Sequence, residues 1–189
     1  GFTFDTYVSR SQWETYSESD RCNLLLRALV LEDDTVETYQ NWMQKLPDAV
    51  HQMSDEDLLA ECTERTKTAC DSFTYNSKGF HATISTDHEN LVFFSVPWEE
   101  GWSAEVNGKP VSIEKADVGF MAVPVPAGDS EITFTYHTPG LKAGALLSLG
   151  GLVLFAGYLT VAGIYNKRHP NPKTESICCV DYSTEETAN

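Results

Sequence analysis

The sequence of 189 residues predicts an α+β protein with a membrane anchor. We expect short N-terminal helices, an antiparallel β-sandwich that is jelly-roll-like, and one C-terminal transmembrane helix. Three observations predict this fold class: helix-start signals in residues 1–69, an apolar period of two in residues 70–138, and no charged side chain in residues 143–165. Residues 166–189 then form a tail, which we expect to be disordered.

The first segment, residues 1–69, is predicted to be mainly helical. Its clearest helix start is Ser54, which three acidic residues follow directly. A serine side chain caps the first turn, and acidic side chains there interact favourably with the helix dipole. Ser11, with Ser9 as the alternative cap, and Ser19 precede two earlier short helices. Residues 33–50 predict a connection with one short helix.

The second segment, residues 70–138, predicts seven short strands at a spacing of about 8–12 residues, as in an antiparallel sandwich. Leu91–Val96 is almost continuously apolar, which is typical of a strand buried on both faces. Asn107-Gly108 predicts a tight hairpin, because both positions of a type I′ turn need a positive φ. Pro124 favours an edge position or an early end for its strand.

The third segment, residues 143–165, predicts a membrane-spanning helix. Its 23 residues exceed the roughly 20 that a helix needs to cross a bilayer core. No face of this helix carries a polar stripe, which argues against the alternative of a buried helix in a soluble protein. The lipid bilayer is therefore the first partner that the sequence indicates.

The flanks of this segment predict its orientation. Lys167 and Arg168 follow the apolar run directly, whereas Lys142 alone precedes it closely. Because positive residues stay on the cytoplasmic side, we expect residues 1–141 to be extracellular and the tail to be cytoplasmic.

One face of the predicted membrane helix carries small residues. Gly144, Ser148 and Gly151 share this face, and small residues let neighbouring helices approach closely. We expect it to pack against another membrane helix, although glycine is also common in membrane helices for other reasons.

Charge is distributed unevenly along the chain. The formal net charge is −15, and residues 1–141 hold 24 acidic residues against 9 lysines and arginines. Such a surface repels nucleic acid and anionic headgroups, which excludes nucleic acid as a partner.

The five cysteines show no metal-site spacing, and no motif indicates a metal or another cofactor. Cys62 and Cys70 could form a disulfide if the outer face is oxidising, but sequence alone does not give their geometry. Cys178 and Cys179 fall in the tail, where a reducing cytosol would keep them as thiols.

The chain begins Gly-Phe-Thr, without an initiator methionine or an N-terminal signal. An extracellular segment has to be carried across the membrane. We therefore expect these residues to be the end of a longer protein whose earlier helices deliver them.

A series of landmarks points to a known family. They are Gly101-Trp102, Asn107-Gly108, Gly119-Phe120-Met121, Gly128 to Ile132, and Tyr136 to Leu141. Their order and spacing resemble the C-terminal end of YfhO-type bacterial membrane proteins, and the resemblance covers about residues 1–165.

This resemblance implies a large polytopic membrane protein with a GT-C-like core in the bacterial cell membrane. It further implies transfer of sugars from an undecaprenyl-phosphate carrier onto envelope polymers such as lipoteichoic acid. The catalytic carboxylate of such proteins is expected in an early extracellular loop that this chain does not contain. No catalytic residue is therefore assigned, and whether the chain acts in an enzyme stays open.

Under this interpretation the chain is non-catalytic support or an acceptor-binding part of the enzyme. Its partners would be the remaining membrane helices of the parent protein and an envelope glycan or lipid-linked sugar. Trp98, Glu99, Glu100 and Trp102 are the candidate carbohydrate-binding residues, because indole rings pack on sugar C–H groups and carboxylates accept hydrogen bonds from hydroxyl groups. The alternative for both tryptophans is packing in the sandwich core.

Two other hypotheses remain. An independent enzyme is disfavoured, because His51, His81 and His88 do not stand in an HExxH motif and no Gly-x-Ser-x-Gly is present. A single-pass adhesin or receptor ectodomain explains the sandwich and the anchor, but it does not explain the glycine-lined helix face.

Overall fold

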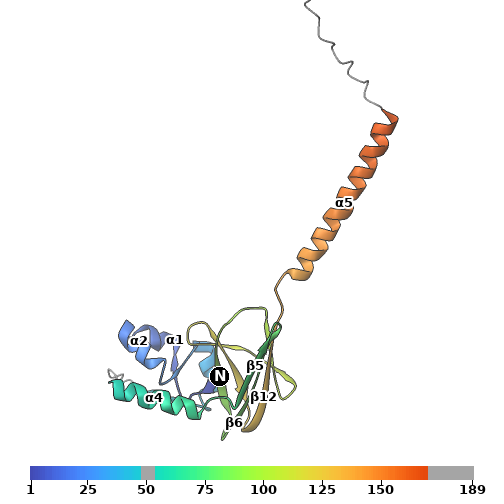
Figure 1. Cartoon of the computed structure of the whole chain (residues 1–189). Helices are drawn as coiled ribbons and strands as arrows, with labels where there is room; N and C mark the ends of the chain where they lie inside the picture. Colours follow the sequence, from blue (N-terminus) through green and yellow to red (C-terminus); the bar gives the residue numbers. More distant parts are fainter. Residues whose placement is uncertain (48–53, 170–189) are drawn as a thin grey trace, which may run out of the picture. The chain divides into compact units, whose positions relative to one another are not determined.

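The computed structural model describes residues 1–47 and 54–169, and it divides into two units. The first is Gly1–Pro139, and the second begins at Gly140 (Figure 1). His51, Cys178, Cys179 and most of the predicted tail lie outside the described residues.

The first unit contains four helices and twelve strands among its described residues. In chain order they are β1 (Phe2–Thr3), β2 (Thr6–Ser9), α1 (Arg10–Glu14), α2 (Glu18–Leu24), β3 (Leu29–Leu31), α3 (Asp33–Tyr39), β4 (Gln44–Lys45), α4 (Asp55–Lys67), β5 (Ser72–Asn76), β6 (Gly79–Thr86), β7 (Asn90–Pro97), β8 (Trp102–Val106), β9 (Lys109–Val111), β10 (Glu114–Ala116), β11 (Phe120–Val125) and β12 (Gly128–Tyr136). The predicted start of α4 is confirmed, because Ser54 forms a capping box with Asp57.

The larger sheet has seven strands in the order β1-β7-β11-β10-β3-β2-β4. It is mixed, because β2 pairs in parallel with both β3 and β4 while its other pairs are antiparallel. Residues 1–69, expected to be mainly helical, thus supply four strands to the sheet that residues 70–138 complete. These strands have two to four residues each, too few to show an apolar period.

The smaller sheet has five antiparallel strands in the order β5-β6-β12-β8-β9. The predicted hairpin between β8 and β9 is confirmed, since Asn107 and Gly108 have φ values of 52° and 71°. The side-chain oxygen of Asn107 also accepts a hydrogen bond of 2.8 Å from the backbone N–H of Glu131 on β12. This contact fixes the hairpin against the central strand of the sheet.

The two sheets pack face to face around the main core. Its buried side chains come from β6, β8 and β12 on one side and from β7 and β11 on the other. The rings of Phe80 and Phe134 stack at its centre with 4.4 Å between centroids, and Phe94 approaches both. The fold class is therefore α+β with two packed sheets, and the larger sheet extends beyond the smaller one.

Helices cover the rest of the larger sheet. A second core of Tyr39, Leu91, Phe93 and others lies on its opposite face beside α3, and a third core lies among α1, α2, β2 and β3. Strand β7 supplies alternate residues to the first and second cores. Leu91 to Phe94 are fully buried, so the prediction of a strand buried on both faces is confirmed.

The second unit contains α5 (Leu141–Arg168), a helix of 28 residues. It includes the predicted segment 143–165 and extends it by a few residues at each end. Gly140 precedes it with a φ of 76°, a conformation that glycine adopts without strain. In the part of the chain that the structure describes, α5 is the one helix long and apolar enough to cross a membrane, and none of its residues is buried.

Candidate functional site

The turn between β7 and β8 and the first residue of β8 carry all four residues that the sequence predicted as carbohydrate-binding. Trp98, Glu99, Glu100 and Trp102 line one pocket of about 330 Å³. Its other lining residues come from β8, β9 and the segment after β9: Ser103, Ala104, Pro110, Val111 and Ile113. The pocket thus combines two aromatic rings, apolar side chains and two carboxylates.

Backbone contacts fix the shape of this turn. The N–H of Trp98 donates a hydrogen bond of 2.9 Å to the carbonyl of Gly119, and that of Trp102 donates one of 3.2 Å to Glu99. Gly101 lies against the end of β12, where an added Cβ would come within 2.6 Å of the carbonyl oxygen of His137. Because no backbone atom can retreat there without disturbing the sheet, this position requires glycine.

Trp102 both packs against the core and lines the pocket. It is half-buried, and its ring lies 5.6 Å from that of Phe80, 6.1 Å from that of Phe134 and 5.0 Å from that of Tyr136. These edge-to-face and tilted contacts hold the indole ring in one orientation. Core packing, the alternative that the sequence left open, therefore fixes Trp102 in place beside the pocket.

Trp98 is half-buried and has a cation over its ring. The ammonium group of Lys115 on β10 lies 3.9 Å from the ring centroid of Trp98. This cation–π contact occupies one face of the indole and holds the ring in place. Any ligand that packs on Trp98 in this arrangement has to use the opposite face or the ring edge.

The two carboxylates of the pocket have different surroundings. The hydroxyl of Tyr136 donates a hydrogen bond of 2.7 Å to Glu99. This bond raises the pKa of Tyr136 above its ordinary value, because a phenolate would lie against the carboxylate. Among the described residues no hydrogen bond or ion pair involves Glu100, which is exposed. Glu99 is thus held in position, whereas Glu100 can accept hydrogen bonds from a ligand.

Sequence reasoning missed two members of the site. Tyr136 and Lys115 lie far from the turn in sequence, on β12 and β10, and only the pairing of strands brings them to it. A signal for Tyr136 existed, since it belongs to one of the landmark motifs, but no local pattern connects it to Glu99. Lys115 had no signal at all.

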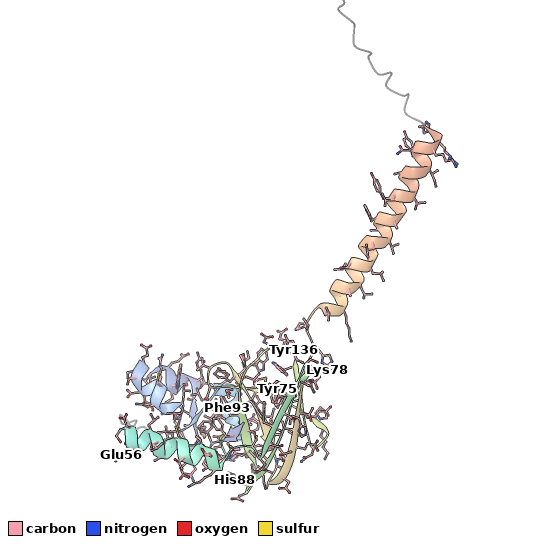
Figure 2. The ribbon with its side chains drawn as sticks, viewed as in Figure 1. Glu56, Tyr75, Lys78, His88, Phe93 and Tyr136 are labelled. Atoms are coloured by element: carbon pink, nitrogen blue, oxygen red, sulfur yellow. The ribbon has the colours of Figure 1, made fainter. Side chains whose placement is uncertain are left out.

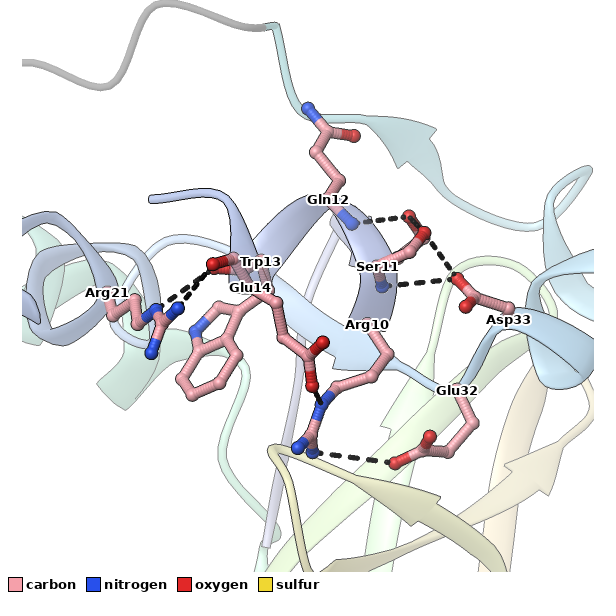
Figure 3. A network of polar contacts seen from close by, with 9 residues as sticks. Arg10, Ser11, Gln12, Trp13, Glu14, Arg21, Glu32 and Asp33 are labelled. Atoms are coloured by element: carbon pink, nitrogen blue, oxygen red, sulfur yellow. Dashed lines mark hydrogen bonds and ion pairs between the residues drawn. The ribbon is translucent and has the colours of Figure 1, made fainter. Parts of the chain in front are cut away.

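The polar network at α1 is structural. Arg10 pairs with Glu14 at 2.8 Å and with Glu32 at 3.8 Å, and the guanidinium groups of Arg10 and Arg21 both lie over the ring of Trp13 (Figure 3). Arg10 thus connects α1 to the start of α3, and the guanidinium group of Arg21 on α2 donates hydrogen bonds to the backbone carbonyls of Trp13 and Glu14 on α1. Each exposed ion pair contributes at most about 1 kcal/mol.

Other candidate groups do not form a site among the described residues. His81 pairs with Glu131 at 2.8 Å on the outer face of the smaller sheet, and His88 lies in the turn after β6. Within the described residues no group of three or more histidine, cysteine, aspartate or glutamate side chains could hold a metal ion.

The cysteines that the structure describes are free thiols. Cys22 and Cys62 are exposed, and Cys70 is half-buried, so the disulfide between Cys62 and Cys70 is not formed here. Burial raises the pKa of the Cys70 thiol, which makes it less reactive than an exposed thiol.

The small-residue face of α5 is open in the structure. An added Cβ at Gly144 or Gly151 would meet no atom within 4 Å, and Ser148 is exposed. The packing of this face against another membrane helix stays a prediction.

Comparisons with known proteins agree with the landmark motifs. The family model described as "Bacterial membrane protein YfhO" matches residues 35–148. The "Uncharacterized protein YfhO" of Bacillus subtilis (strain 168) is 32% identical over 89 residues, which cover 47% of this chain and 10% of that protein. No solved structure matches. The chain therefore aligns with about a tenth of the length of this relative.

Proposed function

Because this chain belongs to the YfhO family of bacterial membrane proteins, we propose that it is the glycan-binding part of a membrane glycosyltransferase. In this proposal residues 1–141 are extracellular and bind the acceptor polymer, lipoteichoic acid or another envelope glycan. The α5 helix anchors them, and the tail is cytoplasmic. The donor is an undecaprenyl-phosphate sugar that another part of the parent protein uses.

One observation carries the proposal: two tryptophans and two carboxylates from the β7–β8 turn and the start of β8 line a single pocket. The C–H groups of a pyranose ring pack on the electron-rich face of an indole, and carboxylates accept hydrogen bonds from sugar hydroxyls. Trp98 and Trp102 supply the rings, and Glu100 supplies the accepting carboxylate. Glu99 positions the turn through Tyr136.

The pocket is suited to binding and not to glycoside cleavage. Glycosidases use two carboxyl groups that face each other across the scissile bond, at about 5–10 Å. Glu99 and Glu100 are instead neighbours on one turn, and Glu99 is engaged by Tyr136. We therefore place catalysis outside this chain, consistent with a role in acceptor binding or in support of the membrane core.

The α5 helix supports the membrane part of the proposal. Its length and apolar composition suit a bilayer, and Lys167 and Arg168 lie in its last turn. These charges support a cytoplasmic tail in this proposal. The face of Gly144, Ser148 and Gly151 would pack on other membrane helices of the parent protein.

The test is a calorimetric titration of deacylated lipoteichoic acid into the full chain in lipid nanodiscs. We expect Trp98→Ala to weaken binding at least tenfold without unfolding the domain, because the ring that packs on the sugar is lost. Glu100→Gln should weaken binding less. Glu105→Gln is the matched control, because Glu105 is exposed on β8 and does not line the pocket.

Equal affinity of the wild type and Trp98→Ala would exclude a role of this pocket in glycan binding. Near-ultraviolet circular dichroism of each variant checks that the remaining aromatic side chains keep their packing. A Lys115→Met variant removes the cation that lies over Trp98 and leaves the ring, so it shows whether the ring binds the glycan without the cation–π contact.

A further inference from the structure

The end of the first unit at which β12 finishes gathers three turns. They join β5 to β6, β7 to β8 and β10 to β11, and we call this region the exit end. The backbone N–H of Tyr136 donates to the carbonyl of Lys78 at 2.7 Å, and that of Trp98 donates to Gly119 at 2.9 Å. Tyr75, Lys78 and Tyr136 lie together there (Figure 2). The chain leaves the sandwich from this end.

Apolar side chains are exposed at the exit end. Within the described part of residues 1–139, the large apolar side chains that are exposed belong to α4, to β5, and to the β10–β11 turn together with the first residue of β11. Tyr75 is 83% exposed, Val118 is 42% exposed and Phe120 is 36% exposed. Two of these three regions thus contribute to one end of the sandwich, beside the half-buried Trp98.

Val118 also has an unusual backbone conformation. Its φ is 73°, in the left-handed region that a β-branched residue rarely adopts, and it follows Asp117 with a φ of 46°. Glycine or asparagine would occupy this exposed turn position without strain. Strained positions persist where the surrounding structure enforces them, and they concentrate at functional sites. The turn thus holds an apolar side chain at the surface, where a partner can contact it.

Covalent continuity indicates what this partner is. Strand β12 ends at Tyr136 and α5 begins at Leu141, so residues 137–140 alone connect them. A chain spans at most about 3.5 Å per residue, which keeps the exit end close to the surface of any bilayer that α5 crosses. Tyrosine and tryptophan are enriched at the membrane–water interface, where their rings lie at the level of the lipid headgroups.

We propose that the exit end rests on the phospholipid bilayer, with Val118, Phe120 and Tyr75 inserted at the boundary between headgroups and acyl chains. Apolar contact carries this docking, because the chain as a whole is acidic. Lys78 and Lys115 lie at the same end and meet the lipid phosphates. The pocket of Trp98 then opens close to the membrane surface. The docking depends on α5 crossing the bilayer, and it does not depend on glycan binding.

The test measures the depth of a nitroxide label in the full chain reconstituted in phosphatidylcholine vesicles. The label is attached at Val118→Cys in a background in which the native cysteines are serine. The control label is at His88→Cys, in the turn after β6, because Thr86 pairs with Gly128 at the opposite end of β12. Collision rates with oxygen, which concentrates in lipid, and with a water-soluble nickel chelate report the depth.

We expect the Val118 label to collide at least threefold more with oxygen than with the nickel chelate, relative to the His88 label. A second label at Phe120→Cys keeps the test valid if one variant misfolds. Labels at both positions that behave like the label at His88 would overturn the proposal.

Vesicles that also contain phosphatidylglycerol separate the two kinds of lipid contact. Insertion in both compositions supports docking through apolar side chains. Insertion only with the anionic lipid would overturn it, because the lysines and not the apolar residues would then carry the contact.

Discussion

A phenylalanine side chain is buried in the main core of the first unit, and another is exposed in the second unit. Phe134 in the sandwich is 2% exposed, and its ring contacts those of Phe80, Phe94 and Trp102. Phe155 in α5 is 59% exposed and shares its helix with other exposed apolar residues. The sandwich hides apolar surface from water within itself, whereas α5 needs an apolar solvent around it. The difference identifies two environments within one chain.

The spacing of apolar residues along the sequence reflects this difference in each unit. The strands of the smaller sheet alternate, because one face meets the main core and the other meets water. Strand β7 of the larger sheet is apolar from Leu91 to Phe94, because both of its faces meet a core. The α5 helix is apolar on every face, which no water-facing helix of a soluble protein is. Burial within the chain explains the first pattern, and lipid explains the second.

The largest expected effect on the free energy of unfolding comes from replacing one phenylalanine by alanine in each unit. We expect Phe134→Ala to lower the free energy of unfolding of the first unit by about 3–5 kcal/mol, because it leaves a cavity in the main core. Phe155→Ala should change the same quantity by less than about 0.5 kcal/mol, as for a site outside the fold. Urea titration of the full chain in detergent micelles measures both.

Tryptophan fluorescence makes this measurement specific, because all four tryptophans lie in residues 1–139. A comparable loss of stability from Phe155→Ala would show that α5 packs on the sandwich, and the contrast between the units would fail.

The sequence predicted those features that a short stretch of residues determines by itself. The apolar helix, the helix start at Ser54 and the Asn107-Gly108 hairpin depend on neighbours within a few positions. Pro124 illustrates a partial success. It lies in β11 opposite Leu91 of β7, and on its other side the pairing with β10 ends at Ala122, so its missing N–H costs no hydrogen bond.

Features that depend on distant residues could not be predicted in this way. The strands β1 to β4 are too short to show a period, and their parallel pairing depends on partners up to about 40 residues away. The four predicted site residues were found because they are neighbours in sequence. Lys115 and Tyr136, which hold two of them in place, reach the turn only through the sheets.

The half-buried carboxyl group of Asp117 in the first unit gives the second prediction. Asp117 accepts a hydrogen bond of 2.9 Å from the backbone N–H of Val30, and burial raises its pKa from 3.8 to about 7. The folded state therefore binds a proton that the unfolded state has lost between about pH 4 and pH 7. The contribution of this group to stability is present below this window and is lost as the pH rises through it.

We expect Asp117→Asn to remove this loss, because the amide keeps the oxygen that Val30 needs and carries no charge. Relative to the wild type, the variant should gain on the order of 2 kcal/mol in the free energy of unfolding between about pH 5 and pH 8. Urea titrations at the two pH values measure the gain. A difference that does not change with pH would show that Asp117 is ionised in the folded protein throughout.

The smallest effect compares a hydroxyl group in each unit. Ser54 caps α4 and is exposed to water. The hydroxyl group of Thr160 in α5 donates a hydrogen bond of 2.8 Å to the carbonyl of Ala156 in its own helix. We expect Ser54→Ala to destabilise α4 by about 1 kcal/mol, because an N-terminal N–H group loses its acceptor. Thr160→Val should leave α5 folded, because every backbone hydrogen bond of the helix remains.

Hydrogen exchange in nanodiscs measures both changes locally. Faster exchange in the first turn of α4 and unchanged protection in the middle of α5 are expected. Loss of protection around Thr160 would mean that water, and not lipid, surrounds this helix.

The central claim is that α5 crosses a membrane and separates residues 1–141 from the tail. The native cysteines test it, because Cys22 and Cys62 are exposed in the first unit and Cys178 and Cys179 lie in the tail. Intact cells are treated with a membrane-impermeant maleimide, and the labelled peptides are identified by mass spectrometry. We expect label on Cys22 and Cys62 and none on the tail cysteines until the cells are opened; label on Cys178 or Cys179 in intact cells would contradict the claim.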